Sequence, residues 1–213
     1  MQRELAGLAV IVGLLLNSGG ALAAPADAEA RYQALLADAK AGDKPVDWQA
    51  LRFAYADRPS FSVFGGTRDD AHRKMSAALS SGDFAGALAL AKSVMNSNFV
   101  DAGAHLVAAI ANRRLGHEDV AGREDEITVG LLKSIETGDG KTATTAFTVI
   151  NVDEEYTLMN ALRLKVSKQA LISQGGHSYD VLDTVSADGH KQSFYFLIDR
   201  VLAAEAAVFA PKH

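Results

Sequence analysis

A long stretch of helical periodicity constrains this chain more than any other feature. Between about Thr67 and Thr137 the apolar residues recur three and four positions apart, the spacing that one face of an α-helix requires. Thr67, Asp83 and Asp101 suit N-caps, because their side-chain oxygens accept hydrogen bonds from free backbone N–H groups. This part of the chain is therefore predicted to form several packed helices.

The helical stretch contains an internal offset of 34 residues. The matching pairs are Gly82 and Gly116, Ala87 and Ala121, and Ala77 and Ala111. This period resembles the tetratricopeptide repeat, in which each unit is a pair of antiparallel helices. The match is partial, because Ala91 fits the second small position of the repeat and Asp125 replaces it in the next copy. An alanine-rich bundle with coincidental spacing is the alternative.

Two shorter helices are predicted before this stretch. The first lies within residues 24–44, and the second carries a stripe of Trp48, Leu51 and Tyr55 that Pro59 ends. The segment from Phe61 to Gly66 is predicted to be an ordered loop.

The pattern changes after Gly138-Asp139-Gly140. We expect a short β-rich run near Phe147, then a helix capped by Asp153, and strands at residues 164–167, 179–185 and 193–198, with a last helix near residues 201–209. The predicted fold class is α+β. A tetratricopeptide-like helical bundle (24–137) precedes a small antiparallel-rich β-sheet with one or two helices (138–213).

Asp188-Gly189 predicts a tight hairpin between the last two strands. A two-residue turn places Ala187 opposite His190. In that register Val181 faces Phe196 and Tyr179 faces Ile198 on one side of the sheet. Leu182 faces Tyr195 on the other side.

The N-terminus has the pattern of a cleavable signal peptide. Arg3 is followed by an apolar run from Leu5 to Leu16 and by the small-x-small motif Ala21-Leu22-Ala23. The apolar run is shorter than the roughly 20 residues that cross a bilayer. We therefore expect cleavage after Ala23 and a periplasmic or secreted product without a membrane span.

Composition excludes several classes of protein. The 213 residues include no cysteine, so disulfides, a thiolate nucleophile and a lipoprotein anchor are excluded. The net charge is -5 and no basic stripe is present, so nucleic acid is not an expected partner. A peptide or protein partner is the expectation.

No sequence motif for catalysis is complete. Gly140-Lys141-Thr142 lacks the earlier glycine of a phosphate-binding loop, since position 135 is Ile. His117-Glu118 lacks the second histidine of a zinc-protease helix, because position 121 is Ala. Gly176-His177-Ser178 has Asp180 where a nucleophile elbow needs glycine. No catalytic residue, metal or cofactor is therefore predicted.

Two polar segments form the candidate binding site. Its residues are Asp153, Glu154, Glu155, Tyr156, His177, Ser178, Tyr179 and Asp180. If the segments meet at one sheet edge, carboxylates, an imidazole and phenols converge there. The alternative is structural, because acidic residues at a helix start are favoured by the helix dipole.

Several motifs of the chain resemble one family. They are Leu51-Arg52-Phe53-Ala54-Tyr55, Gly138-Asp139-Gly140-Lys141, Thr145-Ala146-Phe147, Glu154-Glu155-Tyr156, Gln169, and Gly175 to Val181. Together they resemble the bacterial family filed as domain of unknown function 4919, over roughly Asp47 to Asp199. The resemblance implies export and brings no assigned activity or catalytic residues.

Two classes of function follow from the sequence. The first is a non-catalytic binding or interaction protein of the cell envelope, because helical repeats form concave binding surfaces. The second is a periplasmic hydrolase with a polar site around His177 and the Asp153–Tyr156 segment. An exposed groove between helices would favour binding, and a deep pocket with His177 beside a carboxylate would favour catalysis.

Overall fold

The computed structural model describes residues 25–63 and 68–209. The predicted signal peptide with its cleavage after Ala23, the Thr67 cap and the end of the Phe61–Gly66 loop lie outside these residues. Six helices form the first part of the described chain. They are α1 (Pro25–Ala41), α2 (Trp48–Ala56), α3 (Arg68–Ser81), α4 (Phe84–Ser97), α5 (Ala102–Arg114) and α6 (Glu118–Ile135).

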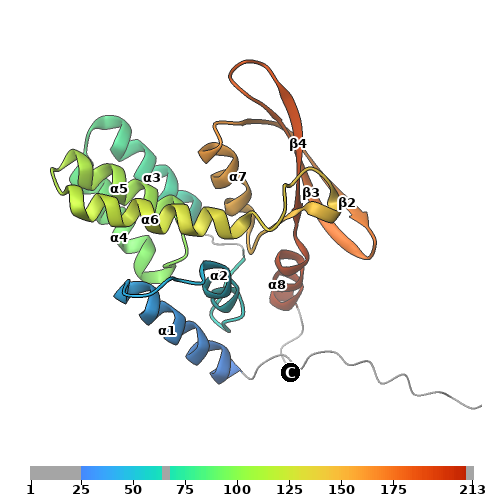
Figure 1. The fold of residues 1–213 in the computed structure, drawn as a ribbon, viewed down its shortest axis with the longest axis horizontal. Helices are drawn as coiled ribbons and strands as arrows, with labels where there is room; N and C mark the ends of the chain where they lie inside the picture. Colours follow the sequence, from blue (N-terminus) through green and yellow to red (C-terminus); the bar gives the residue numbers. More distant parts are fainter. Residues whose placement is uncertain (1–24, 64–67, 210–213) are drawn as a thin grey trace, which may run out of the picture.

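The second part forms a four-stranded sheet with two α-helices. Its elements are the 3-10 helix η1 (Ala143–Thr145), β1 (Phe147–Thr148), α7 (Val152–Ala161), β2 (Lys165–Gln174), β3 (His177–Val185), β4 (Lys191–Leu197) and α8 (Asp199–Phe209). Figure 1 shows the bundle of α3–α6 on one side and the sheet on the other, with α7 between them. The predicted α+β class is confirmed.

The helix starts follow the predicted caps in the bundle but not in α7. Asp83 and Asp101 accept hydrogen bonds from the backbone N–H groups of Gly86 and Ala104, each at 2.9 Å. The cap predicted at Asp153 is wrong. Asn151 caps α7 by accepting from the Glu154 N–H at 3.1 Å, and Asp153 lies within the first turn. There its charge is favoured by the helix dipole.

The 34-residue offset is visible in the positions of the helices. Arg68 and Ala102, the first residues of α3 and α5, lie 34 positions apart, as do Phe84 and Glu118 at the starts of α4 and α6. Gly82 and Gly116 end equivalent helices with φ values of +78° and +83°. Such positive values favour glycine, which has no Cβ.

The alanine pairs of the 34-residue offset are buried alike in one case and differently in the other. Ala87 and Ala121 are both fully buried where neighbouring helices meet. Ala77 is exposed, whereas its counterpart Ala111 is buried. The two helix pairs therefore share the spacing of their starts and their glycine stops, and they pack through partly different small residues.

The strand order in the sheet is β1-β4-β3-β2. The short β1 pairs parallel with β4, and the other neighbours are antiparallel. Gly175 and Gly176, with φ values of +62° and +83°, form the two-residue turn that joins β2 to β3. β2 is consequently longer than the predicted strand at residues 164–167.

The predicted hairpin exists, but its register is wrong by one residue. Ser186 pairs with His190, so the loop contains three residues instead of two. The Gly189 N–H donates to the Ser186 carbonyl at 3.0 Å, and Gly189 has a φ of +85°. Three-residue hairpin loops place a left-handed residue at this position.

The shift changes every cross-strand partner. Leu182 lies opposite Phe194, Val181 opposite Tyr195, and Tyr179 opposite Leu197. A slip of one residue exchanges the two faces of a strand. The observed register places Phe194 and Phe196 on the buried face with Leu182. The predicted register had placed Tyr195 opposite Leu182 instead.

Shared apolar cores connect the helices with the sheet. Leu182, Phe194 and Phe196 pack in one cluster with Leu158 of α7 and Ile135 of α6. A second cluster joins α1, α2 and α6, and a third lies among α3, α4 and α5. In the part of the chain that the structure describes, none of the helices combines the length and apolar character needed for a bilayer span.

Candidate functional site

The structure separates the eight predicted site residues into different surroundings. Glu154 has a structural role, because it forms a bidentate ion pair with the buried Arg52 of α2. Arg52 Nε lies 2.8 Å from Glu154 Oε1, and Nη2 lies 2.5 Å from Oε2. Asp153 lines a cavity of about 20 Å³ with Asn98 and Thr157.

Glu155 and Asp180 form a buried pair of carboxyl groups between α7 and β3. The Glu155 side chain is completely buried, and no described N–H or O–H group donates to either of its oxygens. Asp180 is the neighbouring carboxyl whose charge acts most strongly on Glu155. Such a pair can form a hydrogen bond only if one of the two carboxyl groups keeps its proton.

Glu155 is the group that keeps the proton. Burial, followed by the negative charges of Asp180 and Glu154, raises the pKa of Glu155 to about 9. At neutral pH Glu155 is therefore a neutral acid beside the Asp180 carboxyl group. Burial also raises the pKa of Asp180, and hydrogen bonds from Gln169 and Glu155 oppose that rise.

A hydrogen-bonded chain connects the carboxyl pair to the surface. Gln169 of β2 donates through Nε2 to Asp180 Oδ2 at 2.7 Å. The Tyr156 hydroxyl donates to Gln169 Oε1 at 2.8 Å. Burial, then the charges of Glu155 and Asp180, raises the pKa of the Tyr156 phenol. Glu155, Tyr156 and Asp180 are the predicted site residues that do come together.

His177 lies apart from this cluster, at the start of β3. Its Nδ1 lies 2.5 Å from Asp199 Oδ2, and the Ser178 N–H donates to Asp199 Oδ1 at 2.8 Å. The His177 and Tyr179 ring centroids are 6.4 Å apart in an edge-on arrangement. His177 is more than half exposed in this pair, which joins β3 to the first turn of α8.

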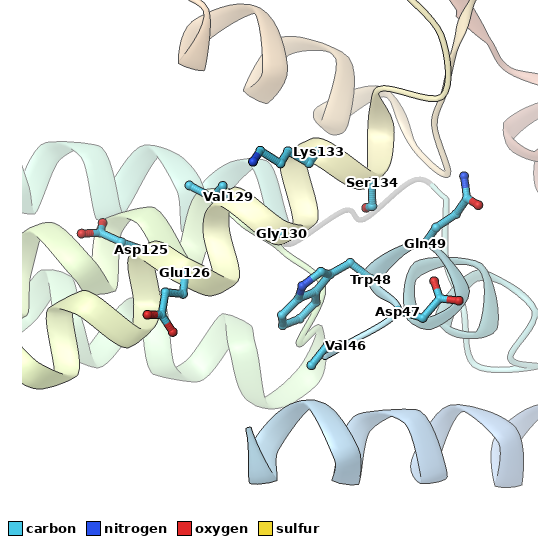
Figure 2. Close-up of a pocket in the computed structure, with 10 residues that line it drawn as sticks. All are labelled: Val46, Asp47, Trp48, Gln49, Asp125, Glu126, Val129, Gly130, Lys133 and Ser134. Atoms are coloured by element: carbon cyan, nitrogen blue, oxygen red, sulfur yellow. The ribbon is translucent and has the colours of Figure 1, made fainter. Parts of the chain in front are cut away.

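A separate concave feature lies between the start of α2 and the middle of α6. It is an open groove of about 650 Å³ (Figure 2). Its lining residues are Val46, Asp47, Trp48, Gln49, Asp125, Glu126, Val129, Gly130, Lys133 and Ser134. Trp48 and Val129 contribute apolar surface to the lining, and the charged residues of the lining are Asp47, Asp125, Glu126 and Lys133.

Trp48 packs directly on the backbone of α6 at Gly130. A Cβ added at Gly130 would lie 2.2 Å from Trp48 Nε1, which is a clash. Glycine inside a helix costs about 0.5–1 kcal/mol relative to alanine. The close approach of the indole explains why glycine occupies this position. Asp47 sets the start of the helix, because its side chain accepts from the Ala50 N–H at 2.9 Å.

Negative charge predominates at the rim of the groove. Asp125 forms an ion pair with Arg113. Asp47 and Glu126 make no ion pair with any residue in the described ranges, and Lys133 is the cation of the lining. The groove therefore combines the Trp48 indole with carboxylates that favour a positively charged ligand.

Residues 26–207 match the family described as Domain of unknown function (DUF4919). The chain belongs to this family. The match covers α1 through most of α8 and confirms the resemblance found in the sequence motifs. No curated protein and no solved structure matches this DUF4919 chain.

Two positions of the quoted motifs have clear structural roles in this DUF4919 chain. Arg52, within the first motif, is the ion-pair partner of Glu154 in another. Gly140, with a φ of +68°, leaves room for the Phe147 ring, because a Cβ there would lie 2.5 Å from Phe147 Cε2. The Arg52–Glu154 pair therefore connects the helical part to the second part, and the Gly140 contact lies within that second part.

The groove was not predicted from the sequence, because Trp48 fits the apolar stripe of its helix without any further role. Two signals point to it in retrospect. Trp48 is the single tryptophan of the chain and follows directly after a capping aspartate. Gly130 lies in the interior of a long helix, where helical spacing alone gives no reason for glycine.

Proposed function

We propose that this protein is a non-catalytic binding protein of the cell envelope, whose Trp48 groove holds an apolar side chain of a peptide or protein partner. The observation that carries the proposal is the open groove of about 650 Å³ between α2 and α6. Aromatic side chains supply much of the binding energy at protein interfaces, because they bury a large area with few rotatable bonds.

The rim charges indicate which peptides should bind. The Asp47 and Glu126 carboxylates favour a ligand in which a lysine or arginine flanks the apolar residue. Lys133 lies at the opposite part of the α6 lining and disfavours a second basic residue there (Figure 2). A short segment with one large apolar side chain and one neighbouring basic side chain fits this arrangement.

The proposal includes export, with cleavage after Ala23. The basic start, apolar run and Ala21-Leu22-Ala23 motif support it. Mass spectrometry of the protein from its native host should find Ala24 at the N-terminus. A native N-terminus at Met1 would contradict export by this route.

The alternative, a periplasmic hydrolase with a site around His177 and residues 153–156, has weaker support. His177 pairs with Asp199 on the surface, away from the carboxyl groups of α7. Glu155 is completely buried, so a substrate does not reach its carboxyl group without movement of α7. The carboxyl pair therefore supports a structural or titrating role better than acid–base catalysis.

The fluorescence of Trp48 tests the proposal directly, because no other tryptophan contributes to the signal. The probes are synthetic hexapeptides with a central phenylalanine or leucine, flanked either by lysine or by glutamate. Lysine-flanked peptides should change the emission in a saturable manner. Glutamate-flanked peptides of the same length should not.

A charge-reversed variant separates groove binding from non-specific attraction. Glu126→Lys should weaken binding of the lysine-flanked peptides, and Glu205→Lys, on α8 outside the groove lining, should not. The proposal fails if every peptide leaves the Trp48 emission unchanged, or if both variants bind the lysine-flanked peptides as the parent does.

A further inference from the structure

A second pocket of about 200 Å³ lies where α1, α4, α5 and α6 converge. Its lining residues are Lys40, Lys92, Met95, Asn96, Phe99, His105, Arg123, Glu124 and Ile127. Figure 1 shows the C-terminal end of α1 beneath the end of α4. Three of these side chains are cationic, and each comes from a different helix.

The histidine and the glutamate of the pocket neutralise each other. His105 Nε2 lies 2.8 Å from the Phe99 carbonyl oxygen, and Nδ1 lies 2.5 Å from Glu124 Oε2. Two oxygen acceptors require two protons between the ring and the carboxyl group. The pair is either imidazolium with carboxylate or imidazole with carboxylic acid, so its net charge is zero in both cases.

The three cations lack carboxylate partners among the residues that the structure describes. Lys92 makes no hydrogen bond or ion pair there, and the Lys40 ammonium lies 5.5 Å from the Phe99 ring centroid. Arg123 donates through Nη2 to the Lys40 carbonyl at 2.6 Å, which caps the end of α1. A carbonyl at a helix C-terminus carries only a partial negative charge, so it does not neutralise Arg123. The pocket therefore keeps a net positive charge.

Gly42 helps to hold Arg123 in this position. The residue has a φ of +67°, and a Cβ there would lie 2.6 Å from Arg123 Nη1. The turn after α1 therefore leaves space for the guanidinium group. Met95, Phe99 and Ile127 supply an apolar wall beside the three charges.

We propose that this pocket binds a compact oxyanion, a carboxylate or a phosphate, that is attached to an apolar group. The cations would hold the oxyanion through charge-assisted hydrogen bonds, which are about twice as strong as neutral ones. The apolar wall would contact the attached group. The site is local, because the protein as a whole carries a net charge of -5 and repels anions elsewhere.

Nuclear magnetic resonance with the ¹⁵N-labelled protein tests this proposal. The probes are phenyl phosphate, benzoate, inorganic phosphate and the uncharged benzyl alcohol. Phenyl phosphate or benzoate should shift the amide signals of Phe99 and Arg123 in a saturable manner. Inorganic phosphate should bind more weakly, and benzyl alcohol should leave these signals unchanged. If phenyl phosphate binds more tightly than benzoate, the natural ligand carries a phosphate group. If benzoate binds more tightly, the natural ligand carries a carboxylate.

Paired lysine variants provide the control. Lys40→Gln with Lys92→Gln should weaken binding of the aromatic anion at least about tenfold, as expected for losing charge-assisted hydrogen bonds. Lys168→Gln with Lys191→Gln makes the same change in net charge on the sheet and should leave binding unchanged. Lys92→Gln alone serves if the double variant does not fold, because Lys92 makes no hydrogen bond or ion pair with the described residues.

The proposal is overturned if both double variants bind equally, or if the shifts do not saturate. Its failure is distinct from failure of the peptide groove. Binding to the groove is measured by Trp48 fluorescence with basic peptides. Binding to the anion pocket is measured by the amide signals of Phe99 and Arg123 with anionic probes.

Discussion

Arg52 and Glu154, which are 102 positions apart in the sequence, form a bidentate ion pair in the interior of the protein. The Arg52 side chain is 0% exposed. Its guanidinium also donates to the Ser134 carbonyl at 2.9 Å and to the Thr148 carbonyl at 3.0 Å. One side chain of α2 therefore contacts α6, β1 and α7, and it joins the helical part to the sheet.

Glu154→Gln should destabilise the fold strongly. The neutral amide would leave the buried Arg52 charge without its counter-ion, and breaking a buried ion pair costs about 3–5 kcal/mol. Urea denaturation of the variant and the parent measures the difference. Glu118→Gln, at an exposed pair with Arg113, should change the midpoint little, because solvent screens such pairs. Equal midpoints for the two variants would show that the buried pair does not hold the two parts together.

Glu155→Gln should stabilise the protein at neutral and alkaline pH. The pKa of Glu155 rises from its ordinary value of 4.5 to about 9 on folding. Below pH 4.5 both states hold the proton. As the pH rises from about 4.5 toward 9, the unfolded chain releases the proton while the folded chain retains it, so the parent loses stability across this window.

The amide of glutamine has nearly the same shape as the protonated acid and does not titrate. The variant should therefore gain on the order of a few kcal/mol over the parent near pH 8 and show little difference near pH 4. Thermal unfolding of both proteins across this range is the measurement. A stability difference that does not change with pH would mean that Glu155 is not the titrating group.

Gly130→Ala should displace the Trp48 indole from α6. The added Cβ would lie 2.2 Å from Trp48 Nε1, so the ring must move toward solvent and its emission should shift to longer wavelength. Gly122→Ala is the matched control in the same helix, because its Cβ meets nothing within 4 Å. It should stabilise α6 by up to about 1 kcal/mol without changing the emission. Identical spectra for the two variants would contradict the contact.

Ala87→Leu should destabilise the helical bundle by overpacking. Ala87 is 0% exposed where α4 meets its neighbours, and a larger side chain in such a position costs about 1–3 kcal/mol. Ala121→Leu, at the equivalent position of α6, should behave in the same way. Ala77→Leu, at an exposed position of α3, should be nearly neutral. Melting temperatures of the three variants test this order, and an equal loss in all of them would contradict it.

The sequence by itself determined most of the local structure. The apolar spacing identified the helices of the bundle, and Asp83 and Asp101 marked two of their starts. The motifs from Leu51 to Val181 identified the family. These features depend on residues within a few positions of one another, where spacing and capping chemistry decide the conformation.

Tertiary structure decided the hairpin register and the grouping of the polar residues. One extra loop residue moved Phe194 and Phe196 to the buried face, because the packing of these rings against Leu182 outweighs the preference of Asp188-Gly189 for a two-residue turn. Glu154 and Glu155 are neighbours in the sequence, yet one is an ion-pair partner and the other a neutral acid.

The two pockets also depend on tertiary contacts that the sequence does not show. Trp48 and Gly130 contact each other although they are far apart in the sequence, and the cationic pocket collects Lys40, Lys92 and Arg123 from three helices. Sequence spacing within any one helix gives no sign of such contacts, since they depend on how the helices pack. Electrostatic interactions and burial depend on distances in space. The charge state and the partners of each side chain are therefore decided only when distant elements pack together.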